Sequence, residues 1–92
     1  MKETIDRWGK EDGIDTSGVT VRYEDLGKHT LGICRCKWRD TSGGKAKGAD
    51  IGIAYQLEGH ITRYGTLWHE YAHFYEWVIY GTSGHGGNWL KA

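Results

Sequence analysis

The sequence has no proline, two cysteines, a single phenylalanine and no long hydrophobic run. Cys34 and Cys36 are too few for a disulfide framework or a four-thiolate zinc ribbon, so we expect both thiols to be reduced. The longest uncharged apolar stretch, around Trp77 to Tyr80, is far shorter than the roughly 20 residues that span a bilayer. The charged segment from Met1 to Asp15 lacks the apolar core of a signal peptide. We therefore expect a cytoplasmic protein with no membrane association.

The length of 92 residues predicts a single domain over residues 1–92. A chain of this size buries only about two-thirds of the surface that its unfolded form exposes, so a bound metal would add useful stability. Five histidines and 13% aromatic residues are present, and the net charge is zero. The stretch from Arg22 to Lys47 is nevertheless basic, with seven basic and three acidic residues. That charge fits a polyanion partner or a solvated hairpin equally well.

Alternation of apolar and polar residues predicts strands at Val19–Tyr23, His29–Trp38 and Asp50–Tyr55. The glycine- and lysine-rich stretch Thr41–Gly48 predicts a flexible hairpin loop between the second and third strands. Met1–Trp8 has some helical character, but the glycines that follow favour an irregular segment before the first strand. The middle of the chain is therefore expected to form a small antiparallel sheet.

The hydrophobic period changes after the third strand. From Thr62 or Thr66 to Tyr80, apolar residues recur every three or four positions, which predicts an amphipathic helix that ends at Gly81. Gly32 and Gly52, inside two of the strands, suggest a close backbone approach or a bulge. The expected fold is α+β, with a three-stranded antiparallel sheet packed on one long helix.

That helix contains the HExxH pattern in His69-Glu-Tyr-Ala-His73. Two imidazoles four residues apart lie on one helix face about 6 Å apart along the axis, close enough to bind one tetrahedral zinc. In metallohydrolases with this motif, the intervening carboxylate contacts the reacting water rather than the metal. The alternative is a solvent-facing pair of histidines, but the position of the motif in the middle of an amphipathic helix favours a zinc site.

A catalytic zinc usually has three protein ligands and one open position. After Tyr75, the sequence offers two side chains as the third ligand, Glu76 and His85. A straight helix carries Glu76 past the metal, so we interpret it as a neighbour of the site. His85 remains, and the glycines on both sides of it allow the chain to fold back toward the helix.

His69-Glu-Tyr-Ala-His73, followed at short range by His85-Gly-Gly-Asn-Trp89, resembles the HExxH and H-G-x-x-(F/W) pair of the SprT-like (Spartan-like) zinc metallopeptidases. The strands with Gly32-Ile-Cys34 and Ile51-Gly-Ile53 extend the similarity to roughly residues 19–90. The resemblance implies a zincin-like fold and one Zn²⁺ per chain. It also implies that His69, His73 and His85 are the zinc ligands and that Glu70 is the catalytic base.

The expected function is that of a zinc metalloendopeptidase, which hydrolyses a protein or peptide substrate through a zinc-activated water with Glu70 as general base. Tyr64, Tyr75 and Tyr80 are near enough in sequence to stabilise an oxyanion. Tyrosines on so aromatic a helix are more often core residues, so we assign none of them. The strand Asp50–Tyr55 is the expected edge for binding an extended peptide by strand addition.

The basic stretch supports an alternative function. Charge and an aromatic surface are combined, as in single-strand binders, by Arg35, Lys37, Trp38, Arg39, Lys45 and Lys47. The resemblance strengthens this interpretation, because Spartan-type enzymes cleave proteins on DNA. A solvated, lysine-bearing strand edge explains the same residues. The alternative is thus a catalytically silent, zinc-stabilised domain that binds single-stranded DNA or a protein partner.

Overall fold

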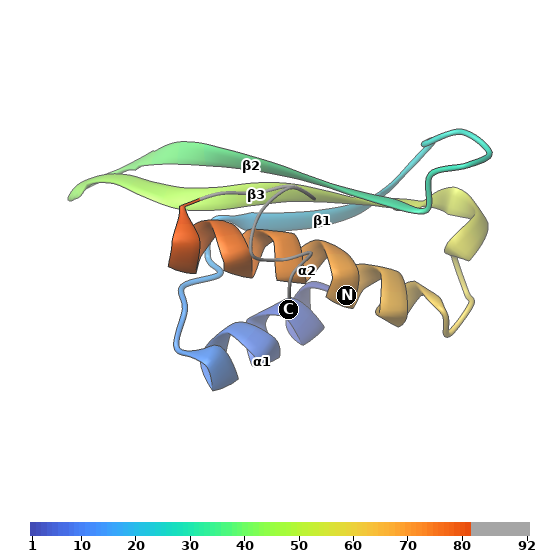
Figure 1. The fold of residues 1–92 in the computed structure, drawn as a ribbon, viewed down its shortest axis with the longest axis horizontal. Coiled ribbons are helices and arrows are strands. Elements are labelled where there is room, and N and C mark those ends of the chain that lie inside the picture. The colour runs from blue at the N-terminus through green and yellow to red at the C-terminus, as the bar shows by residue number, and fades with distance from the viewer. Residues whose placement is uncertain (82–92) are drawn as a thin grey trace.

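Two helices lie on one side of a three-stranded sheet in the computed structural model, which describes residues 1–81 (Figure 1). The elements in chain order are α1 (Lys2–Asp12), β1 (Val19–Glu24), β2 (Gly32–Thr41), β3 (Gly44–Ala54), the 3-10 turn η1 (Tyr55–Leu57) and α2 (Arg63–Tyr80). The predicted α+β class is confirmed. Within the described residues, no helix is long and apolar enough to cross a membrane.

The sheet is mixed rather than antiparallel, which corrects one detail of the predicted fold. Its strand order is β1-β3-β2, with β1 parallel to β3 and β2 antiparallel to β3. Strands that follow each other in the sequence, as β1 and β2 do, commonly pair in an antiparallel sheet. The connection between them instead crosses the end of the sheet, and β3 lies between the two strands. Alternating residues identify a strand, but they do not specify its neighbours.

The central place of β3 also corrects the predicted peptide-binding edge. Asp50–Tyr55 belongs largely to β3, where Asp50–Ile53 pair with β1 on one side and with β2 on the other and so have no free edge. Among the described strands, β1 and β2 are the edge strands.

The predicted flexible loop Thr41–Gly48 is largely paired strand. The register of β2 and β3 continues to the pair Thr41 and Gly44, which leaves only Ser42 and Gly43 as the hairpin loop. The Thr41 hydroxyl donates a 3.0 Å hydrogen bond to the Gly44 carbonyl. Backbone hydrogen bonds form whatever the side chains are, so a glycine-rich composition did not prevent pairing.

The N-terminal segment, expected to be irregular, forms the helix α1. Ile5 is fully buried in the core, and Trp8 packs edge-on against Trp68 of α2 at 4.9 Å between ring centroids. These tertiary contacts outweigh the low helix propensity of Gly9.

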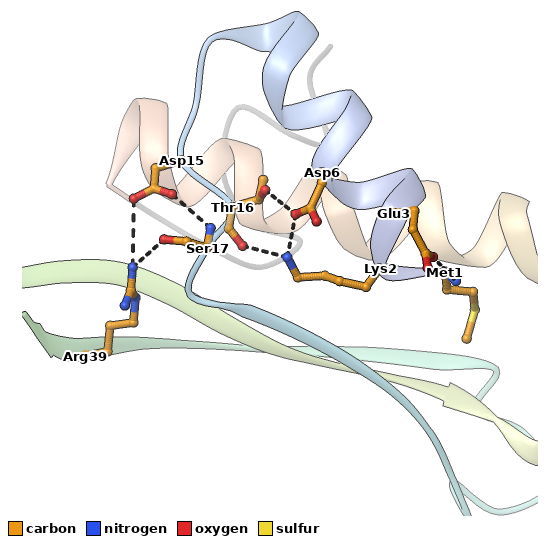
Figure 2. Close-up of polar contacts among 8 residues, drawn as sticks. All are labelled: Met1, Lys2, Glu3, Asp6, Asp15, Thr16, Ser17 and Arg39. Atoms are coloured by element: carbon orange, nitrogen blue, oxygen red, sulfur yellow. Dashed lines mark hydrogen bonds and ion pairs between the residues drawn. The ribbon is translucent and has the colours of Figure 1, made fainter.

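The loop after α1 is tied to the helix and to the sheet (Figure 2). Asp6 accepts hydrogen bonds from Lys2 and, at 2.7 Å, from the Thr16 hydroxyl. Ser17 accepts a 2.6 Å hydrogen bond from Arg39 of β2. The loop therefore fixes α1 beside the start of β1.

The helix α2 confirms the strongest prediction from hydrophobic periodicity. It ends at Tyr80 and is capped by Gly81, which has φ 77° and donates its N–H to the Trp77 carbonyl at 2.9 Å. Its inner face packs against the sheet, and the buried hydrophobic core consists of Ile5, Val19, Ala49, Ile51, Ile53, Leu67, Tyr71 and Phe74.

Candidate active site

The HExxH motif lies in the middle of α2, where one helical turn separates its two histidines. The Nε2 atoms of His69 and His73 are 3.3 Å apart, and the ring centroids are 4.9 Å apart. His73 is buried and His69 is partly exposed. The helix therefore presents two imidazole nitrogens side by side.

This donor pair fits zinc. A tetrahedral zinc with Zn–N bonds of about 2.0–2.1 Å places two ligand nitrogens roughly 3.3–3.4 Å apart. The observed separation of 3.3 Å between the two Nε2 atoms agrees with that requirement. His69 and His73 can therefore hold a zinc without rearrangement of the helix.

Glu70 directly follows His69 in the motif, and its carboxyl group lies against Gly32 of β2. It is only 5% exposed, and this burial raises the pKa of its carboxyl to about 7. A carboxyl group with a pKa near neutrality can both accept and release a proton at physiological pH. The motif thus supplies an acid–base group beside the histidine pair.

The first residue of β2 borders Glu70. A Cβ added at Gly32 would lie 2.6 Å from Thr66 Cγ2 and 2.9 Å from Glu70 Oε2. Only a glycine therefore allows the strand to approach the helix this closely. The sequence signal for this contact was the glycine inside a strand.

The two cysteines lie on the face of β2 that is turned toward α2. Their sulfur atoms are 3.9 Å apart, and Cys34 packs against the hydrophobic core. No disulfide joins the two sulfur atoms. The hydrogen bond with Cys36, burial and the nearby Glu70 all raise the pKa of the Cys34 thiol.

The third predicted ligand, His85, lies outside the described residues 1–81. Within those residues, no group of three or more His, Cys, Asp or Glu side chains is arranged to hold a metal ion. Glu76, interpreted from the sequence as a neighbour of the site, is 3% exposed. Its carboxylate oxygens have no hydrogen-bond partner among residues 1–81.

The model of the SprT-like family matches residues 3–92 of the chain. The chain belongs to the SprT-like family. Comparison with curated proteins and with solved structures gives no match. The match covers α1 as well as the strands and α2, and so reaches beyond the part of the chain in which the sequence motifs lie.

In this SprT-like domain, the six residues of the predicted nucleic-acid surface are divided between the two faces of the sheet. Three of them pair with carboxylates: Arg35 with Glu24 at 3.0 Å, Lys37 with Asp50 at 3.0 Å and Arg39 with Asp15 at 3.8 Å. These ion pairs neutralise much of the charge that the sequence suggested was available.

Trp38 and Lys47 lie opposite each other on β2 and β3 and pack against the end of α2. The Lys47 ammonium donates a 2.8 Å hydrogen bond to the Trp77 carbonyl and lies 5.1 Å from the centroid of the Trp77 ring. Trp38 contacts Trp77 edge-on at 5.6 Å. Both residues thus stabilise the C-terminal turn of the helix. Lys45, the sixth residue, is exposed beside Asp40 near the hairpin loop.

The three tyrosines considered for oxyanion stabilisation are spread along α2. Tyr64 and Tyr75 are partly buried against the core, whereas Tyr80 is 58% exposed. None of these positions distinguishes one tyrosine as a partner of Glu70.

Proposed function

We propose that this SprT-like domain is a zinc-dependent endopeptidase. The observation that carries the proposal is the 3.3 Å separation of the His69 and His73 Nε2 atoms, with the buried Glu70 on the same turn of α2. His85 is proposed as the third ligand, on the strength of its sequence context and of the family match to residues 3–92.

Zinc held by these histidines would supply the Lewis acidity that makes water nucleophilic at neutral pH and polarises the scissile carbonyl. Glu70 accepts the proton of the attacking water and then delivers it to the leaving amine. Burial of the Glu70 side chain raises the pKa of its carboxyl above the usual range, which favours acceptance of a proton.

The outer edge of β2 is the proposed place for an extended substrate. Among the described strands, β2 pairs only with β3, and its first residue, Gly32, borders Glu70. A peptide added to this edge would form backbone hydrogen bonds close to the acid–base group.

Glu70→Gln tests the proposal, because it removes the base and retains the size of the side chain. Zinc content is measured by mass spectrometry and cleavage is followed with fluorescently labelled casein. We expect about one zinc per chain and a loss of cleavage of roughly 10²- to 10⁴-fold. Glu58→Gln, the same change at an exposed carboxylate, should leave both quantities unchanged.

Two outcomes would contradict the proposal. Unchanged cleavage by Glu70→Gln would assign the activity to another group or to a contaminant. A zinc content that is indifferent to His85→Ala would remove the proposed third ligand. A single-stranded oligonucleotide added to the same assay tests the alternative role, and stimulation that is lost in Lys45→Ala would favour a nucleic-acid contact.

A further inference from the structure

A small aromatic cavity lies between the C-terminal end of α1 and the outer face of α2. It has a volume of about 160 Å³ and is lined by Asp12, Trp68, Tyr71, Ala72 and Tyr75. Trp8 packs beside this aromatic cluster, with its ring centroid 5.4 Å from that of Tyr71. Trp68 is 52% exposed although it belongs to this cluster, so the cavity is accessible from solvent.

The cavity has a negative electrostatic character. Among the described residues, Asp12 has one hydrogen-bond partner, the Tyr71 hydroxyl, which donates to its Oδ2 at 2.5 Å. No ion pair joins Asp12 to another described residue. Asp12 is also the last residue of α1, where the helix dipole is negative.

We infer that this cavity binds the guanidinium group of an arginine side chain from a bound polypeptide. The faces of tryptophan and tyrosine rings attract cations, and the attraction grows when the cation is shielded from water. A guanidinium is planar, stacks on aromatic faces and is less strongly hydrated than an ammonium. The remaining Asp12 oxygen can accept a hydrogen bond from it.

The cavity lies next to the histidine pair on the same helix. Trp68 and Ala72 each directly precede a histidine of the motif. The face of α2 that lines the cavity and the face that carries the histidines are therefore about 100° apart around the helix axis. A polypeptide that reaches the histidines can therefore place a neighbouring side chain in the cavity. The identification of that polypeptide as the substrate rests on the proposed function, whereas the binding of arginine does not.

The test measures binding separately from cleavage. The full-length, zinc-loaded protein is titrated with acetyl-Gly-Arg-Gly-amide while the indole NMR signals are recorded, and Trp68→Phe assigns the signal of Trp68. The matched ligand contains citrulline, which has nearly the same shape as arginine and no charge. We expect the arginine peptide to shift the Trp68 signal and to bind about tenfold more tightly than the citrulline peptide.

Asp12→Asn removes the charge and keeps an oxygen that can accept the Tyr71 hydrogen bond, so it should reduce the preference for arginine to the part that the aromatic rings supply. Asp40→Asn, the same change at an exposed residue of the hairpin, should leave that preference intact. Equal binding of arginine and citrulline, equal binding of a lysine peptide, or no shift of Trp68 would overturn the inference. Because Glu70→Gln should still bind the arginine peptide, a failure of the peptidase proposal would be seen separately.

Discussion

Gly32 shows how one residue connects the sheet to the acid–base group. We predict that Gly32→Ala lowers the free energy of unfolding by about 1–3 kcal/mol, because its methyl group would overlap Thr66 and Glu70. The displaced Glu70 should also reduce cleavage. Urea unfolding and the casein assay measure the two effects.

Gly43→Ala is the matched control for this prediction. A Cβ at Gly43 meets nothing within 4 Å, and its φ is not positive. The control should therefore fold and cleave normally. Unimpaired stability and activity of Gly32→Ala would show that β2 does not constrain Glu70.

Cys34 gives a prediction about pH. Its pKa is raised in the folded protein, so folding favours the neutral thiol. The resulting stability is complete below the unfolded-state pKa of about 8.5 and is lost as the pH rises above that value. As the pH is raised from 7 to 9.5, the urea concentration at the unfolding midpoint of the wild type should decrease. The midpoint of Cys34→Ala should decrease less.

Alkylation provides an independent check of the same property. Iodoacetamide should modify Cys34 slowly in the folded protein and rapidly in urea, since only the thiolate reacts. Fast modification of Cys34 in the folded state at pH 8 would contradict the raised pKa.

At the residue scale, the sequence predicted the HExxH motif but not the contacts that the basic residues make. The spacing of His69 and His73 predicted the paired nitrogens, because a helix fixes that geometry locally. Three of the six proposed nucleic-acid residues are instead held by carboxylates from distant segments: Arg35, Lys37 and Arg39. Such ion pairs depend on the strand register, which residue types alone do not specify.

Among the elements, α2 was the most predictable and α1 the least. The apolar stripe of α2 extends over several turns, so local periodicity alone reveals it. The helix α1 depends on Ile5 and Trp8 packing against other elements. The paired strand residues within Thr41–Gly48 were also not predicted, because backbone pairing outweighed a composition rich in glycine and lysine.

The first turns of α2 contain a glycine that the fold does not require. Gly65 is exposed, a Cβ there meets nothing within 4 Å, and its φ is not positive. We predict that Gly65→Ala stabilises the domain by about 0.5–1 kcal/mol, because alanine loses less backbone entropy in a helix. Thermal unfolding should show a Tm increase of roughly 2–8 °C. A lower Tm would indicate that the fold requires a residue without a side chain at position 65.

For the whole molecule, the sequence indicated the α+β class but not the mixed topology. Strand periodicity and the long helix defined the parts. The parallel pairing of β1 with β3 joins Val19 to Ala49, so it depends on contacts between distant segments. No local signal marks that pairing.

This topology has a consequence for the order of folding. The β2–β3 hairpin closes a loop of two residues, whereas the β1–β3 pairs join residues 30 positions apart. Closing the longer loop costs more chain entropy, so we expect the hairpin to form in the transition state and β1 to join it later. Gly44→Ala, which places a side chain at φ 121°, should slow folding. Val19→Ala should chiefly accelerate unfolding. Stopped-flow kinetics in urea measure both rates, and slower folding of Val19→Ala would instead place β1 in the folding nucleus.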